Sequence, residues 1–225
     1  MQLIFLYLLT ISFPSKNIGE ETFNHTVSFE TPRYVKMTDT VFQVGDLIQH
    51  NAVFRYRLGP SYMMTKEEKA GIPASDTTQF SYFLELVDFI KSHTELSFEI
   101  GCHTDYRGNA ATNIHLTQTR ANLIVRVMIE EYSIDYEQIR AKGYGREKPS
   151  VVYFCDGQYF RYMDDPVSWT CEEEPIPLLL TNEYIQKFKD NRVLHEHLHQ
   201  LNRRTEVKVI EVQDCMHMGG PRIHV

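Results

Sequence analysis

The feature that most limits the fold of this chain is a strand, a polar loop and a helix in direct succession. Residues 96–102 alternate apolar and polar side chains, which predicts a strand with one face on a core. Apolar residues then recur at helical spacing over residues 117–132, which predicts a helix. Asp105 lies in the loop and Arg120 in the first turns of the expected helix, so the fold can bring them together. An acid beside a base suits a ligand that carries both charges.

Arg120 is an unusual residue for the place that this pattern gives it. If Thr117 caps the helix, Arg120 lies three residues in, where the helix dipole disfavours a cation. A glutamate would be expected there, because it would complete a capping box. We therefore expect an anion near Arg120, either Asp105 as a structural partner or the carboxylate of a ligand.

Other segments show the patterns of further strands and helices. The expected elements are a strand over 41–56, a loop over 59–75, a helix from a cap at Asp76-Thr77 to about Ser92, a strand over 139–144 and a last strand over 204–213. Together with the central strand and helix, they give an α+β or α/β sandwich with helices packed on one sheet.

A long segment between Pro149 and Asn202 precedes the last strand. Asp156-Gly157 stands between two aromatic-rich runs within residues 151–163, which predicts a hairpin with a type I′ turn. An acidic patch and prolines follow, and a helix is expected over 181–199.

The charge of the chain argues against one class of partner. The 225 residues carry a formal net charge of −7, and the sequence pI is about 5.8. Proteins that bind nucleic acids neutralise phosphates with clustered Lys and Arg. Nucleic acid is therefore not expected as a partner.

An apolar run near the start and four cysteines point to an exported protein. Leu3 to Phe13 is too short for a membrane span of ~20 residues but fits the core of a signal peptide. Four cysteines are compatible with disulfides in an oxidising periplasm. A bridge between Cys155 and Cys171 would contribute about 3 kcal/mol in the chain-entropy model, whereas Cys102 and Cys215 are expected to be buried thiols.

Several short motifs occur in a fixed order along the chain. They are His103-Thr104-Asp105, Gly108, Asn113, Leu116-Thr117, Arg120-Ala121, Gly143-Tyr144-Gly145 with Pro149, and Asn202-Arg203-Arg204. Together they resemble the peptidoglycan-binding signature of the OmpA C-terminal domain family, which includes the domains of OmpA, MotB and Pal. Arg146 departs from the pattern, because the family usually has glutamate there.

The resemblance implies an OmpA-like α+β fold: a β-α-β-α-β sandwich with helices on one mixed sheet and a long insertion before the last strand. The expected organisation is a signal peptide over 1–19, an N-terminal extension over 20–38, the OmpA-like domain over 39–213 with its insertion at 150–198, and a tail over 214–225. The resemblance also implies a place in the periplasm and cell envelope, associated with the outer membrane.

The resemblance further implies non-catalytic, non-covalent binding of peptidoglycan through the diaminopimelate of its stem peptide. Asp105 would hold the ammonium, and Arg120 would hold the carboxylate with one arginine of Arg203-Arg204. Alternation along a strand lets only one of these two arginines face the site, and we expect it to be Arg204. The other expected ligand-binding residues are Thr104, Asn113, Leu116 and Thr117. No cofactor and no metal is expected.

Three other interpretations compete with this one. Asp105 and Arg120 could form an internal ion pair that ties the loop to the helix. His195, Glu196 and His199 fit the H-E-x-x-H pattern of zinc hydrolases. Aromatic residues of the insertion could dock another envelope protein or form a small core of their own; these are Tyr153, Phe154, Tyr159, Phe160, Tyr162 and Trp169.

Overall fold

The computed structural model describes residues 29–52, 77–162 and 171–213. The expected signal peptide, the loop over 59–75, the cap at Asp76, Trp169, Cys215 and the tail lie outside the described residues. The chain divides into two compact units, Met1–Thr31 and Pro32–Val225. The elements named below all lie in the second unit.

A five-stranded mixed sheet forms the centre of the fold. In spatial order its strands are β1 (Tyr34–Lys36), β2 (Leu47–Gln49), β8 (Thr205–Val212), β3 (Leu96–His103) and β4 (Ile139–Gly145). β3 pairs parallel with β4 and antiparallel with β8, so the last strand of the chain lies beside the first long one. The expected α+β fold with a mixed sheet is confirmed, as are the expected strands at β3, β4 and β8.

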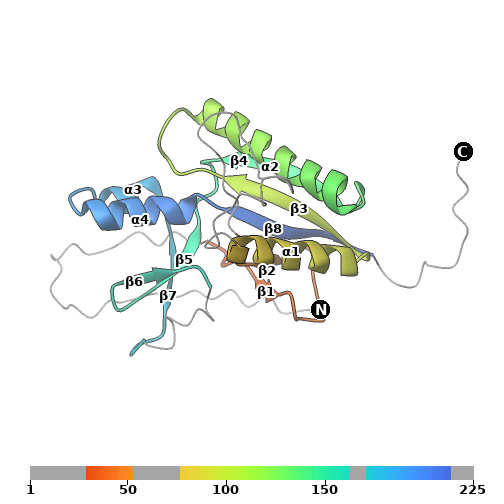
Figure 1. Cartoon of the computed structure of the whole chain (residues 1–225). Coiled ribbons are helices and arrows are strands. Elements are labelled where there is room, and N and C mark those ends of the chain that lie inside the picture. The colour runs from red at the N-terminus through yellow and green to blue at the C-terminus, as the bar shows by residue number, and fades with distance from the viewer. Residues whose placement is uncertain (1–28, 53–76, 163–170, 214–225) are drawn as a thin grey trace, which may run out of the picture. The chain divides into compact units, whose positions relative to one another are not determined.

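Helices α1 (Thr77–Ser92) and α2 (Ala110–Tyr132) share the main core with this sheet (Figure 1). Period two puts Phe98 and Ile100 of β3 on the same face as Val207 and Val209 of β8, and all four are buried in this core. The helices contribute Phe83, Leu86, Val87, Phe89, Ile90, Ala121, Ile124 and Met128. No helix in the described part of the chain is long and apolar enough to cross a membrane.

The second helix begins seven residues earlier than expected. Asn109 caps α2, since its side chain accepts a hydrogen bond from Thr112 N, and Thr117 lies fully buried inside the helix. The prediction of a helix start at Thr117 is therefore wrong. The start was missed because the buried residues of the first turns, Asn113 and Thr117, are polar, so the spacing of apolar residues could not reveal them.

The prediction of one strand over 41–56 is wrong for residues 41–46, whereas β2 lies inside that range and residues 53–56 lie outside the described part of the chain. A turn precedes β2, because the buried Asp46 carboxylate accepts hydrogen bonds from Gln43 N (2.7 Å) and from Arg33 Nη1 (3.0 Å). The backbone at Gly45 has a φ of 101°, which glycine adopts without a steric penalty. β1 lies within residues 20–38, the range expected as an extension, and it pairs parallel with β2.

The segment before β8 folds as a small sheet with two helices. The sheet has the order β6 (Gln158–Phe160), β5 (Val151–Cys155) and β7 (Ile176–Leu179), and the helices are α3 (Asn182–Gln186) and α4 (Arg192–Asn202). The expected hairpin is confirmed, with positive φ at Asp156 (48°) and Gly157 (80°), as a type I′ turn requires. The prediction of one helix over 181–199 is wrong, because Thr181 and Asn191 cap two separate helices.

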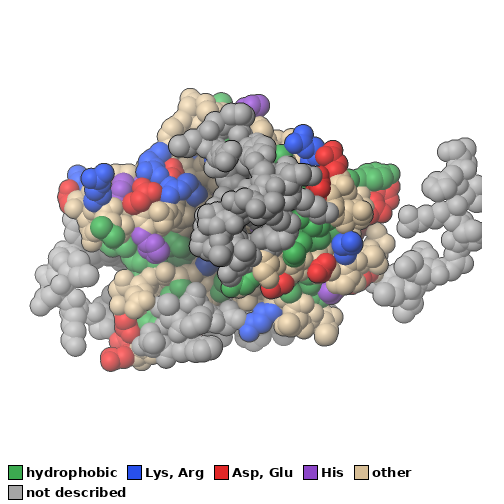
Figure 2. Space-filling view, in the orientation of Figure 1, with side chains coloured by type: hydrophobic (Ala, Val, Ile, Leu, Met, Phe, Trp, Pro, Cys, Tyr) green, Lys and Arg blue, Asp and Glu red, His purple; other side chains and the backbone are tan. Residues whose placement is uncertain are grey.

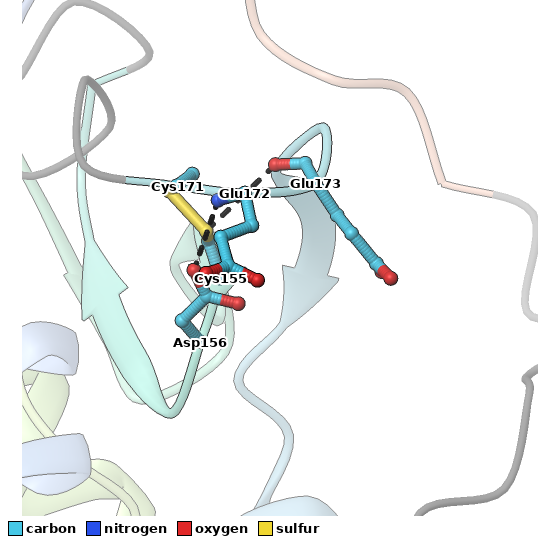
Figure 3. Close-up of a disulfide and its surroundings, with 5 residues drawn as sticks. All are labelled: Cys155, Asp156, Cys171, Glu172 and Glu173. Atoms are coloured by element: carbon cyan, nitrogen blue, oxygen red, sulfur yellow. Dashed lines mark hydrogen bonds between the residues drawn. A yellow bond between two sulfur atoms is a disulfide. The ribbon is translucent and has the colours of Figure 1, made fainter.

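A disulfide joins Cys155 at the end of β5 to Cys171 ahead of β7 (Figure 3). Beside it, Glu172 N donates to Asp156 Oδ2 (3.1 Å), so the hairpin turn is tied to the segment that returns to the sheet. The sequence alone left the pairing of the four cysteines open, and the structure joins Cys155 to Cys171. Cys102 is a buried thiol, as expected.

The insertion has a hydrophobic core of its own. Val152, Leu180, Ile185 and Leu198 are buried there, and aromatic side chains pack against them. The hydroxyls of Tyr159 and Tyr184 lie 2.7 Å apart. Phe160 is also buried. These two aromatic residues of the hairpin, Tyr159 and Phe160, are thus partly or fully covered within the domain.

Candidate functional site

The end of β3 holds Asp105 in a defined position. Thr104 N donates to Gly145 O (2.7 Å), and His103 N donates to Arg204 O (2.9 Å). One bond reaches the end of β4 and the other reaches the residue that precedes β8. Because strands on both sides anchor the end of β3, Asp105 leaves the sheet at a fixed point.

Asn113 and Arg146 fix the loop that follows Asp105. Asn113 Nδ2 donates to Arg107 O (2.9 Å), while Arg146 Nη1 donates to Tyr106 O (3.0 Å) and Gly108 O (3.1 Å). Gly108 has a φ of 82°, which turns the chain toward α2. Arg146, where glutamate is usual in the family, therefore ties the loop after β3 to the loop after β4.

Two arginines bind the carboxylate of Asp105. Arg107 donates to it from its backbone N (2.9 Å), from Nε (3.2 Å) and from Nη2 (2.6 Å). Arg203 Nη1 approaches the same carboxylate at 2.5 Å. Burial by itself would raise the pKa of Asp105, but these hydrogen bonds outweigh it and lower the pKa from 3.8 to about 2. Asp105 is therefore a stable anion at neutral pH.

Glu196 of α4 joins the same two arginines. Its Oε2 lies 2.9 Å from Arg107 Nη1, and its Oε1 lies 2.8 Å from Arg203 Nη2. Asp105, Arg107, Glu196 and Arg203 thus form a closed ring of alternating charges, which we call the Asp105 ring. The side chain of Asp105 is 7% exposed, whereas that of Glu196 is 43% exposed. Acidic, basic and histidine side chains lie next to one another over α4 on the face drawn in Figure 2.

Of the two neighbouring arginines, Arg203 is the one that reaches Asp105. Arg204 turns away: its Nε binds Glu206 Oε1 at 2.6 Å, and its side chain is 4% exposed. Burial would raise the pKa of Glu206, but Arg204 and His103 lower it well below the usual range. Arg203 is therefore the arginine of this pair that contacts Asp105, whereas Arg204, the one expected to face the site, compensates the charge of Glu206.

Arg120 lies in the third turn of α2, not in the first. It is half-buried and two turns beyond Asn113 on the helix. The dipole argument for a neighbouring anion therefore does not apply to it, since the dipole effect is confined to the first and last turns. Within the described residues, Asp105 makes no hydrogen bond or ion pair with Arg120; its bases are Arg107 and Arg203.

The other residues expected at the site lie around the loop. Thr104 is buried and directly precedes Asp105 in the sequence. Asn113 is buried on α2 and binds the loop after Asp105, and Leu116 is half-buried on the same helix. Thr117 Oγ1 donates to Asn113 O (2.8 Å) and accepts from Gly145 N (2.9 Å). Thr117 therefore links α2 to the end of β4, which places it behind the Asp105 ring as a structural contact.

An open pocket of about 470 Å³ adjoins the same loop. It is lined by Tyr106, Ala110, Arg146, Glu147, Pro149 and Asn182. Tyr106 follows Asp105 directly in the sequence. Arg146 and Glu147 give the lining one group of each charge.

The geometry does not support the zinc alternative. Glu196 binds Arg107 and Arg203, and the rings of His195 and His199 meet edge to face with centroids 4.6 Å apart. In the described parts of the chain, the group of three possible metal ligands that lies close enough is Cys155, Asp156 and Cys171. Its two sulfurs form the disulfide, so they are not thiolate ligands.

Sequence reasoning missed two members of the Asp105 ring. Arg107 carried a detectable signal, since a residue two positions after an aspartate commonly donates its backbone N–H to that carboxylate. Glu196 was considered as part of a zinc motif. Its partners come from other segments of the chain, and its own neighbours in sequence carry no signal for them.

A family model identifies the class of domain in part of this chain. Residues 66–156 match the family model described as OmpA family. The chain therefore contains an OmpA-type domain, with its Asp105 loop and α2 inside the matched range.

One curated protein and two solved structures are similar to parts of this chain. Over 64 residues the chain is 36% identical to outer membrane porin F of Pseudomonas aeruginosa. The matched stretch covers 28% of this chain and 18% of that protein. The peptidoglycan-associated lipoprotein from Burkholderia pseudomallei aligns over 58% of this chain and 91% of its own, with 21% identity and a TM-score of 0.32. The cell wall anchor of the T6SS from Pseudomonas aeruginosa aligns over 69% and 75%, with 14% identity and a TM-score of 0.36. TM-scores this low support no conclusion about function.

Proposed function

We propose that this chain binds peptidoglycan non-covalently and anchors a component of the cell envelope. The observation that carries the proposal is the Asp105–Arg203 contact at the ends of β3 and β8. Asp105 lies within residues 66–156, which match the OmpA family, and Arg203 lies beyond that range in the Asn202-Arg203-Arg204 segment that resembles the family's motif. Such a pair can hold both charges of one amino-acid centre.

In the proposed complex, the ligand is the diaminopimelate of a stem peptide. Asp105 would accept hydrogen bonds from the ammonium group, and Arg203 would bind the carboxylate. Arg120 stays in the proposal as a second base, because a side chain on a helix points back toward the N-terminus, which here is the side of the Asp105 loop. The open pocket beside Tyr106 would take the neighbouring part of the peptide.

The proposed activity is binding without chemistry, and the proposed place is the periplasmic side of the envelope. Docking of an envelope protein by the insertion stays a prediction. The partly covered positions of Tyr159 and Phe160 do not favour the two as anchors for a partner.

The test is retention on purified sacculi. Wild type, Asp105→Ala, Arg203→Ala and Arg120→Ala would be compared, with Asp88→Ala and Arg126→Ala as exposed controls of the same charge on α1 and α2. We expect the retention of the Asp105 and Arg203 variants to fall by about tenfold or more. The controls should bind as wild type does. Equal retention of all folded variants would contradict the assignment.

A competition assay addresses the ligand class. A soluble stem peptide that ends in diaminopimelate should release the wild type from sacculi, whereas a peptide with an internal lysine in its place, whose side chain has an ammonium but no carboxylate, should do so poorly. Release by both at equal concentration would show that the site does not read the amino-acid centre.

A further inference from the structure

Arg107 and Glu196 together present a cation and an anion to the site, as a bound zwitterion would. Arg107 places its guanidinium on Asp105, with Nη2 at 2.6 Å from Oδ2. Glu196 places its carboxylate on Arg203, with Oε1 at 2.8 Å from Nη2. The two are themselves joined by an ion pair of 2.9 Å. The acid and the base assigned to the ligand are thus both already occupied from within the chain.

Both occupying side chains lie at the solvent side of the ring. The side chain of Arg107 is 52% exposed and that of Glu196 is 43% exposed, whereas Asp105 is covered. The Arg107–Glu196 pair is exposed on both sides, so water and salt screen it and it contributes little. A ligand that brings its own ammonium and carboxylate would replace the charges that Arg107 and Glu196 give to Asp105 and Arg203, so Asp105 and Arg203 would keep partners of opposite charge.

We propose that Arg107 and Glu196 act as an internal pseudo-ligand that competes with the peptidoglycan zwitterion for Asp105 and Arg203. This inference rests on the proposed function. Glu196 belongs to α4, so the insertion before β8 sets how tightly the site binds its ligand. Glu196, which comes from the insertion, takes the place of the ligand's carboxylate. Arg107, which comes from the loop after β3, takes the place of its ammonium.

The experiment compares Glu196→Gln with wild type in a titration with a soluble stem peptide that ends in diaminopimelate. Glutamine keeps the size of the side chain but gives up the charge that holds the two arginines. We expect the affinity to rise by about three- to tenfold, as removal of a weak competing interaction predicts. Glu174→Gln removes an exposed charge elsewhere in the insertion and serves as the matched control, with unchanged affinity expected.

A second probe separates competition from a general change of charge. The same peptide with the diaminopimelate carboxylate converted to an amide should show no gain with Glu196→Gln, because it has no anion for the vacated position. An equal gain with the amidated probe would overturn the proposal.

Arg107 provides an independent check, because the two roles it could have predict opposite results. As a competitor of the ammonium, Arg107→Gln should raise the affinity for the stem peptide. A loss of affinity would show that Arg107 contacts the ligand directly, and it would overturn the pseudo-ligand. Loss through misfolding is recognised by the thermal unfolding curve of the same sample.

The outcomes for the two proposals differ. If wild type binds and Glu196→Gln binds equally well, the pseudo-ligand is wrong and peptidoglycan binding stands. If neither binds, the proposed function fails, and the inference fails with it. If only Glu196→Gln binds measurably, the pseudo-ligand is supported, and the proposed function fails for the wild-type protein.

Discussion

Arg203 Nη1 lies 2.5 Å from Asp105 Oδ2, although 98 residues separate the two along the chain. The register of the sheet explains the contact. Cys102 of β3 pairs with Thr205 of β8 in antiparallel register, and the next bond outward joins His103 N to Arg204 O. Asp105 follows His103 by two residues and Arg203 precedes Arg204 by one, and their side chains meet just beyond the sheet. The acid and base meet because two neighbouring strands end and begin at the same edge.

Thr117 is expected to stabilise the fold that supports this edge. Its buried hydroxyl joins Asn113 O to Gly145 N. Thr117→Val keeps the shape but leaves Gly145 N without its acceptor, so we expect the free energy of unfolding to fall by about 1 to 3 kcal/mol. Urea unfolding followed by circular dichroism measures the change.

Thr119→Val is the matched control for that substitution. Thr119 is exposed on the same helix, and its hydroxyl donates to His115 O (2.9 Å) in the same geometry. Water can replace that bond, so the change should stay within about 0.5 kcal/mol. Equal losses for both threonines would mean that the link to Gly145 contributes nothing.

Asn202, the first residue of the Asn-Arg-Arg motif, is expected to have a structural role. It is buried, its Oδ1 accepts from Ser150 N (2.8 Å), and its Nδ2 donates to Leu180 O (2.9 Å). Asn202→Ala leaves both backbone groups unsatisfied, so we expect a loss of about 2 to 4 kcal/mol in chemical unfolding. The exposed Asn122 gives the control alanine variant, and a similar loss there would contradict the argument.

The charge of Asp105 predicts a pH dependence of stability. Its pKa in the folded protein is about 2, below the ordinary value of 3.8. A lowered pKa stabilises the fold above the ordinary value, and this contribution is lost as the pH falls from about 4 through the folded pKa. We expect Asp105→Asn to remove about 1 to 2 kcal/mol of the wild-type decrease in that window.

Urea midpoints at closely spaced pH values between about 2 and 6 measure this dependence. Asp88→Asn, an exposed change of the same charge, is the control. A wild-type slope that survives in Asp105→Asn would assign the acid sensitivity to other carboxylates, such as Glu206, whose pKa is also lowered.

The Cys155–Cys171 disulfide predicts a redox dependence that is local to the insertion. It closes a loop with a sequence separation of 16. In the chain-entropy model such a loop contributes about 3 kcal/mol, so a Cys155→Ser, Cys171→Ser double variant should lose about that much stability. A reducing agent should destabilise the wild type equally and leave the double variant unaffected. A further effect of reductant on the double variant would require another reducible group.

The regular parts of the fold could be predicted where the sequence pattern and the burial agree. Alternation revealed β3 and β8, and Asp156-Gly157 fixed the hairpin, because these signals act within a few residues. The start of α2 was missed, since its first buried side chains are the polar Asn113 and Thr117. The spacing of apolar residues predicted one helix over 181–199, whereas caps at Thr181 and Asn191 begin two separate helices there.

The sequence by itself determined the strands β3, β4 and β8, the Asp156-Gly157 hairpin, the motifs of an OmpA-type domain and Asp105 as the acid of the proposed site. Only the tertiary structure decided which bases surround it. Whether Arg203 or Arg204 faces Asp105 depends on the register of β8 against β3, and the presence of Glu196 depends on where α4 packs. Contacts between residues far apart in the chain follow from strand pairing and helix packing, which short-range patterns do not encode.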